Sequence, residues 1–223
     1  TKLINPPVST FTKGLSKAGQ VTGGFSFANL MIGKIIENDG IILQNEAQEV
    51  IVDWGNNPEF YRYARINSAD AFSRYGKTDE AYRYPYLTFE HHKSTNEAAA
   101  RAVAVAAFFP DNVEMAIEYT VLAYKNVCNN TLGLAGACAV SAAISAAMKE
   151  DAQYYDVLQA AIYGARRGMD TAESYRVQPA ACALVDRRME LAVEIGFRYG
   201  GDFAKAMKEL DECIGTTEYV NES

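Results

Sequence analysis

The sequence predicts an all-α protein. Apolar residues recur at helical spacing through most of the chain, and alternating, valine-rich strand patterns are missing. Hydrophobic residues make up 49% and charged residues 22%, a composition typical of a folded globular protein. The 223 residues can bury one large core, and neither a fixed-period repeat nor a Pro/Ser-rich linker divides them. We therefore expect a single domain over 1–223.

The first predicted helix lies in "FSFANLMIGKIIEN". Ala28, Met31, Ile32 and Ile35 fall at positions i, i+3, i+4 and i+7, which places them on one helix face. The pair Asp39-Gly40 should end this helix in a turn, because glycine adopts the backbone conformations that turns require. A short helix over 46–54 should follow, ended by "GNNP".

The middle of the chain predicts the centre of the structure. A helix should begin after Asp111 or Asn112, since either side chain can cap it. The segment 134–148 is almost wholly apolar and rich in alanine. Small side chains let neighbouring helices approach closely, so we predict that this segment is the central helix of a packed bundle.

Three further helices are expected towards the C-terminus, in "YYDVLQAAIYGARRG", "ALVDRRMELAVEIGFRYG" and "GDFAKAMKELDECIG". In the last of these, Asp202 should cap the helix. Its apolar positions are spaced as one stripe, which we expect to face inward: Phe203, Met207, Leu210 and Ile214.

The stretch 61–86 is crowded with tyrosines, arginines and short polar residues. Tyrosine rings can stack on a base or a sugar, or they can cover the edge of a core. The tyrosine spacing is partly helical, which favours half-exposed helices whose tyrosines cover the core edge.

Charge and composition exclude several classes of protein. The net charge of −7 and a pI near 5.0 argue against a nucleic-acid partner, because phosphate neutralisation needs a basic surface. No signal peptide and no apolar run long enough to span a membrane is evident, so we expect a cytoplasmic protein without a membrane partner. The four cysteines lack CxxC spacing, which argues against a zinc site. Cys138 and Cys182 are expected to be buried thiols, and His91-His92 a solvated pair.

Two short motifs could carry chemistry. Thr22-Gly23-Gly24 is neither a phosphate loop with a following lysine nor a G-x-G-x-x-G fingerprint. Two glycines at a helix start cost backbone entropy, so a further reason for them is needed. Ser94 or Thr95 should cap a helix that carries Glu97 in its first turn, with Asn96 between them. Such a helix start can also bind an anion, which makes this motif a candidate phosphate site.

Several stretches, taken in order, resemble the ADP-ribosylglycohydrolase (DraG-like) family. "AGQVTGGFSFANLMIGKIIENDG" is similar to the family's G-x-V-T-D-D segment and the helix after it. "STNEAAARAVAVAAFFPDN" is similar to its T-N-G-A-A-M-R segment, and "LGLAGACAVSAAISAAM" to its A-G-A-C-A-V-A-A-A helix. The resemblance runs over nearly the whole chain. It implies a single orthogonal multi-helix bundle of the ADP-ribosylglycohydrolase type.

The resemblance also implies a chemistry. Family members hydrolyse the glycosidic bond of ADP-ribosylated substrates, and carboxylates hold a pair of metal ions, usually magnesium, that orient the attacking water. Thr22 matches a metal-binding threonine of the family, but Gly23 and Gly24 replace the two aspartates that follow it. Glu97 stands where the family has glycine. Other acidic segments of the family site are expected before Thr1 and after Ser223.

From this resemblance we expect no catalytic residue, no metal ligand and no cofactor in this chain. The substrate-binding candidates are the residues that match the two motifs: Thr22, Gly23, Gly24, Thr95, Asn96 and Glu97. The expected function is that of an ADP-ribosylglycohydrolase-like protein with impaired or lost hydrolysis. The alternative is a non-catalytic pseudoenzyme or structural protein. It would bind ADP-ribose or another nucleotide-sugar, or associate with itself or a partner chain through exposed apolar helix faces.

Overall fold

The computed structural model describes residues 21–62, 64–76, 94–180 and 182–215, and the regular secondary structure of these residues is helical throughout. The all-α prediction is therefore confirmed. In chain order the helices are α1 (Gly23–Glu37), α2 (Gln44–Asn56), α3 (Pro58–Tyr61), α4 (Ile66–Tyr75), α5 (Glu97–Arg101), α6 (Val103–Ala106), α7 (Val113–Tyr124), α8 (Thr131–Ala147), α9 (Tyr154–Ser174), α10 (Val185–Tyr199) and α11 (Phe203–Cys213).

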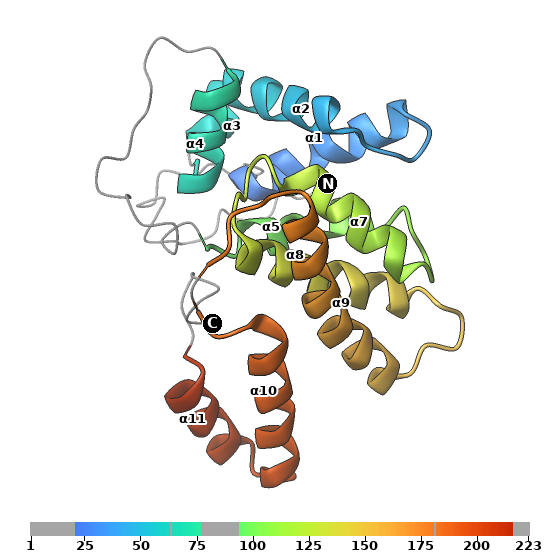
Figure 1. Cartoon of the computed structure of the whole chain (residues 1–223), viewed down its shortest axis with the longest axis vertical. Coiled ribbons are helices and arrows are strands. Elements are labelled where there is room, and N and C mark those ends of the chain that lie inside the picture. Colours follow the sequence, from blue (N-terminus) through green and yellow to red (C-terminus); the bar gives the residue numbers. More distant parts are fainter. Residues whose placement is uncertain (1–20, 63, 77–93, 181, 216–223) are drawn as a thin grey trace, which may run out of the picture.

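The first four helices lie together at one end of the molecule (Figure 1). Helix α1 packs on α2, and α2 packs on α4. Of the face predicted for α1, Ala28, Met31 and Ile35 are buried and Ile32 is half-buried. The indole of fully buried Trp54 on α2 donates to Ser26 Oγ on α1 over 2.9 Å. This hydrogen bond satisfies a buried polar group and fixes the register of the two helices.

Helix α8 is the centre of the fold, as its small residues predicted. It packs against α5, α6, α7, α9 and α10. Its tightest contact is with α9, where Gly164 and Gly168 face Cys138 and Ala142. A Cβ atom built on Gly164 would lie 2.4 Å from Ala142 Cβ and 2.5 Å from the Cys138 carbonyl oxygen. The two helix backbones can approach this closely only because these α9 positions carry no side chain.

Most predicted helix ends are close to the observed ones. Asn112 caps α7 by accepting from the Met115 amide over 3.2 Å, and Asp202 caps α11 by accepting from the Lys205 amide over 3.2 Å. Asp39 and Gly40 form the turn after α1 with positive φ angles of 54° and 94°. The apolar run that begins at Glu97 does not form one continuous helix. It is divided into two short helices, α5 and α6. The tyrosine-rich stretch 61–86 contains helix α4, as its partly helical spacing predicted. Residues 77–86 of this stretch lie outside the described part of the chain.

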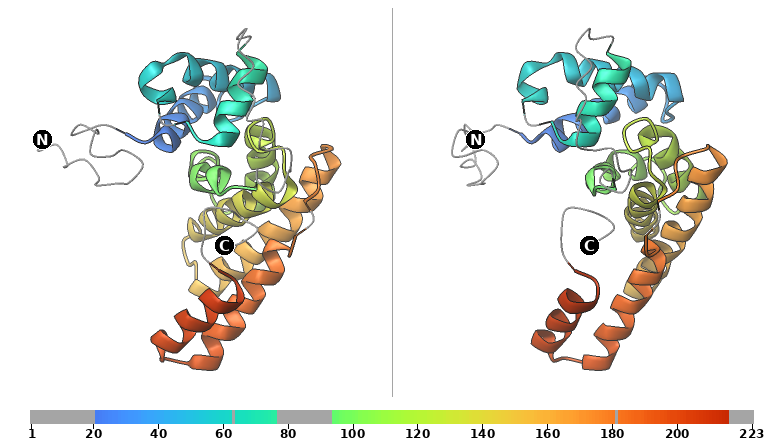
Figure 2. Two further views of the ribbon diagram at one scale, coloured as in Figure 1. Left: turned by 90° about the vertical axis from the view of Figure 1, so that its left-hand side faces the viewer. Right: turned by 60° about the vertical axis from the view of Figure 1, so that its left-hand side comes forward.

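Helices α10 and α11 form a hairpin at the end of the molecule opposite α1–α4 (Figure 2), and α10 packs on α9 and α8. The prediction that the apolar stripe of α11 faces inward is wrong for Phe203 and Met207, which are 76% and 43% exposed. Helix α11 packs against α10 and has no buried residue. Among the described helices α10 is its main neighbour, and that contact leaves Phe203 and Met207 uncovered.

The cysteine prediction is confirmed for Cys138, which is fully buried, whereas Cys182 is partly exposed. Cys128 is also buried, and burial raises the pKa of its thiol to about 12. His91 and His92 lie outside the described residues. Within the described ranges, every helix is too short or too polar to cross a membrane.

The α8–α9 contact yields a stability prediction. Gly164→Ala should lower the free energy of unfolding by about 1–3 kcal/mol, because the new methyl group meets the α8 backbone. The matched control is Gly33→Ala on α1, where an added Cβ meets nothing within 4 Å. This change should raise stability by about 0.5–1 kcal/mol through helix propensity. Urea unfolding followed by circular dichroism measures both, and equal effects of the two changes would contradict the close contact.

Candidate functional site

Thr22, Gly23 and Gly24 form the start of α1. Thr22 is the N-cap, and its Oγ1 accepts from the Phe25 amide over 3.2 Å. Gly23 is buried, and its carbonyl accepts from Ser26 Oγ over 3.1 Å. A Cβ on Gly24 would meet only Thr22 Oγ1, at 3.9 Å. Packing therefore does not require glycine at position 24, and the first turn of α1 carries no acidic residue.

Thr95, Asn96 and Glu97 form the start of α5. Asn96 is the N-cap residue without a side-chain cap bond, and Glu97 lies in the first turn as predicted. The prediction that Ser94 or Thr95 is the cap of this helix is wrong, although the Thr95 Oγ1 atom lies 3.5 Å from the Glu97 backbone nitrogen. The same oxygen accepts from Asn67 Nδ2 on α4 over 3.0 Å. Thr95 thus ties the start of α5 to α4.

The Glu97 side chain turns inward and is only 2% exposed. Its Oε2 accepts from Ser68 Oγ over 2.7 Å and lies 3.4 Å from Arg101 Nη2. The same Arg101 nitrogen donates to Ser68 Oγ over 2.8 Å. The backbone nitrogen of Asn67 lies 3.4 Å from Glu97 Oε1. Glu97 is therefore one member of a buried ion pair bridged by a hydroxyl group.

Arg101 is the cation of this pair and is itself 3% exposed. Its guanidinium carbon lies 4.4 Å from the centre of the Phe27 ring on α1, a cation–π contact. Burial lowers the Arg101 pKa, and the Glu97 carboxylate opposes that shift. Within the described residues, Arg101 Nε and Nη1 have no hydrogen-bond partner, nor does the buried Ser94 Oγ. An unpaired buried donor lowers the stability of the folded state. A hydrogen bond from one of these groups to an acceptor oxygen would remove that cost.

The structure thus brings the two sequence motifs onto neighbouring helices, because Phe27 of α1 lies against Arg101 of α5. Asn67, Ser68 and Arg101 belong to this site as well, and they were not predicted from the sequence. The spacing i, i+4 of Glu97 and Arg101 is a signal for an ion pair on one helix. The contribution from α4 has no such signal, because it comes from about 30 residues earlier in the chain.

The residues at this site do not fit magnesium. Mg²⁺ requires several oxygen ligands in near-octahedral geometry. Thr22 Oγ1 is engaged in the helix cap, Gly23 and Gly24 offer no side chain, and Glu97 is bound to Ser68 and Arg101. Among the residues that the structure describes, no three His, Cys, Asp or Glu side chains lie together as a metal site would need.

No family model matches this chain, and comparisons with curated proteins and with solved structures give no match either. The resemblance to ADP-ribosylglycohydrolases therefore stays a prediction made from the sequence.

The buried pair predicts a specific pattern of stabilities. Glu97→Leu or Arg101→Met alone should lower the free energy of unfolding by about 3–5 kcal/mol, because each leaves its buried partner without a counter-charge. The double variant should recover most of that loss, since an apolar pair of similar volume avoids both desolvation costs. Urea unfolding of the four proteins forms a double-mutant cycle. Strictly additive losses would show that Glu97 and Arg101 are not coupled.

Proposed function

We propose that this chain is a non-hydrolytic relative of the ADP-ribosylglycohydrolases that binds ADP-ribose or a related nucleotide-sugar without a metal ion. The observation that carries the proposal is the buried pairing of Glu97 with Arg101 at 3.4 Å. The one carboxylate among the six candidate residues is held by the fold and is not free to hold a metal or activate water.

The two motifs suggest how such a ligand would be held. Helix α1 has 15 residues, and its N-terminus carries the positive end of the helix dipole, with no acidic residue in its first turn to offset it. A phosphate group at Thr22 and Gly24 would be stabilised by that dipole and by backbone amides. Arg101 and Ser94 are buried behind this motif and carry polar atoms without a hydrogen-bond partner in the described residues.

The direct test is isothermal titration with ADP-ribose, with and without Mg²⁺. We expect the same affinity in both conditions and no release of ADP-ribose from ADP-ribosylated arginine or serine peptides. Gly24→Asp should weaken binding about tenfold or more, because a carboxylate at the α1 N-terminus repels phosphate, and the position has space for it. Gly24→Asn is the matched neutral control and should bind like the unaltered protein.

Binding that requires Mg²⁺, or hydrolysis by the unaltered chain, would overturn the proposal. Absence of any binding would favour the second candidate function.

The second candidate is self-association through the α10–α11 hairpin, and the exposed apolar side chains of this hairpin support it. Phe197 on α10 and Phe203 on α11 are 73% and 76% exposed, and Met207 is 43% exposed. Large apolar side chains gathered on one protruding element are typical of protein contacts. A second copy of the hairpin offers a matching apolar surface, as in an isologous dimer.

Sedimentation velocity tests this candidate. We expect a dimer that Phe203→Asp converts to a monomer, because the charge would be buried in the contact. Ala204→Asp is the control, since this neighbouring residue is also exposed but lies outside the apolar stripe. A monomer at all accessible concentrations of the unaltered chain would exclude self-association through the hairpin.

A further inference from the structure

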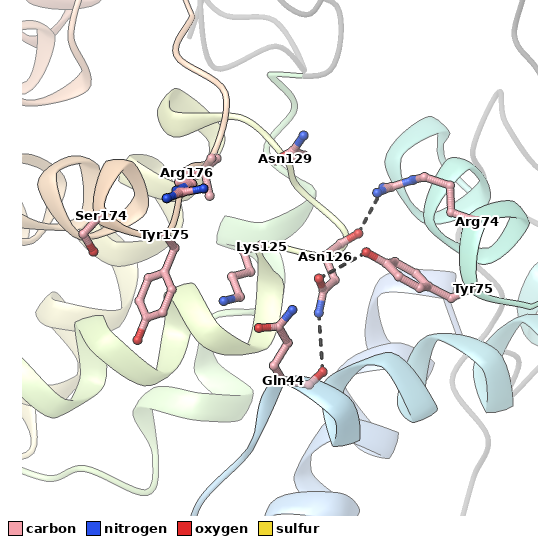
Figure 3. A pocket seen from close by; sticks show the side chains of 10 residues that line it. Gln44, Arg74, Tyr75, Lys125, Asn126, Asn129, Ser174, Tyr175 and Arg176 are labelled. Carbon is pink, nitrogen blue, oxygen red and sulfur yellow. Dashed lines mark hydrogen bonds between the residues drawn. The ribbon is translucent and has the colours of Figure 1, made fainter.

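An open pocket of about 520 Å³, drawn in Figure 3, shares no lining residue with the site described above. It is formed by the start of α2, the end of α4, the loop between α7 and α8, and the end of α9. Three cationic side chains line it: Arg74, Lys125 and Arg176. Amide and phenol groups make up much of the remaining wall, and its lining, as far as the structure describes it, includes neither Asp nor Glu. We call it the Arg176 pocket.

Two of the three cations lack a counter-charge in the described part of the chain. Lys125 Nζ lies 3.9 Å from the centre of the Tyr175 ring and forms no ion pair there. The guanidinium of Arg176 likewise forms none. Arg74 is partly engaged, with its Nε 3.1 Å from Asp70 Oδ2 and its Nη2 donating to the Asn126 carbonyl over 3.1 Å. In a chain with net charge −7, this gathering of unpaired positive charge is unexpected.

Two acidic side chains contact the pocket lining, and each is already engaged by one of its residues. Glu118 accepts a hydrogen bond from the Tyr175 hydroxyl, and Asp70 pairs with Arg74. Partial burial lowers the Lys125 pKa, although Glu118 raises it to a smaller extent. A partly desolvated ammonium group with no bound counter-charge is stabilised by an arriving anion.

A simpler explanation is that the three cations only complement helix dipoles, because they stand at the C-terminal ends of α4, α7 and α9. Arg74 fits that explanation, since it donates to a backbone carbonyl. Arg176 does not, because its backbone has a φ of 59°, in the left-handed region that glycine usually occupies after a helix. An arginine at this position is strained, and the strain is unnecessary for a dipole effect, which any position in the last turn provides.

We propose that the Arg176 pocket binds a small phosphate-bearing molecule, with its phosphate between Lys125 and Arg176. Gln44 and Asn129 also line the pocket, and their side-chain amides are of the kind that binds hydroxyl groups of a ligand's polar remainder. The volume lies in the range of cofactor and metabolite sites and far exceeds a single phosphate. This inference goes beyond the proposed function and does not rest on it.

The test is titration calorimetry with inorganic phosphate, ribose 5-phosphate and unphosphorylated ribose. Ribose 5-phosphate should bind more tightly than inorganic phosphate, and ribose should not bind measurably. Lys125→Gln and Arg176→Gly should each weaken the binding of ribose 5-phosphate at least tenfold. Arg176→Gly should at the same time raise the melting temperature, because glycine relieves the left-handed strain. Loss of binding in a more stable protein cannot be attributed to unfolding.

Asp39→Gly is the matched control for the backbone change, since Asp39 also has a positive φ, 54°, and lies outside the pocket lining. It should raise the melting temperature without altering affinity. Absence of ribose 5-phosphate binding, equal binding of ribose, or unchanged affinity in both pocket variants would overturn the inference. Gly24→Asp should leave ribose 5-phosphate binding unchanged, so the failure of the ADP-ribose proposal and the failure of this one are distinguishable.

Discussion

The close approach of α8 and α9 is the contact on which the positions of the other helices depend. Gly164 and Gly168 leave no room for a Cβ atom against Cys138 and Ala142. With α9 seated there, α8 is covered along that side, and α5, α6 and α7 pack on its other faces. Thr120 donates to Ser141 over 2.8 Å within this core, so α7 and α8 are joined by a polar contact as well as by packing. Helix α5, whose first turn carries Glu97, packs on α8 of this pair.

The buried arginine adds a second constraint, because it must be satisfied by several elements at once. Arg101 contacts Ser68 of α4 and Phe27 of α1, and its backbone carbonyl accepts from the Tyr124 hydroxyl of α7 over 2.7 Å. A short helix such as α5 has little stability of its own. Its conformation is held by these contacts from three neighbouring helices. The same contacts commit Glu97 to the interior, which is why its carboxylate acts as a counter-charge and not as a ligand.

How much of this could be predicted from the sequence depends on the range of the interactions. Local signals predicted the caps at Asn112 and Asp202, the turn at Asp39 and the face of α1, since each depends on neighbouring residues. The small residues of α8 predicted its central position. The inward prediction for Phe203 was wrong, because periodicity identifies an apolar face but cannot tell whether a partner helix covers it.

Site residues from distant segments were the least predictable. Ser68 and Glu97 meet only through the packing of α4 on α5, and neither residue has a motif that anticipates the contact. The Arg176 pocket was missed for the same reason. Its residues come from four separate segments, and each cation, read alone, resembles an ordinary solvated side chain. Arg176 differs from an ordinary solvated arginine in its left-handed backbone conformation. That conformation is a property of the structure and cannot be read from the sequence.

Both candidate sites lie where the α1–α4 helices meet the rest of the molecule. One hydrophobic core spans both groups of helices, because Phe27 and Trp54 belong to the same buried cluster as Tyr124, and polar links lie beside that core. At one place the link is Arg101 with its polar neighbours. At the other it is Asn126, whose amide accepts from the Tyr75 hydroxyl over 3.2 Å and lies 3.5 Å from the Gln44 carbonyl. Polar links leave hydrogen-bonding groups at the junction that a wholly apolar contact would not. A junction between packed units is also where cavities commonly form. The polar groups that join the two parts are therefore the groups best placed to hold a ligand.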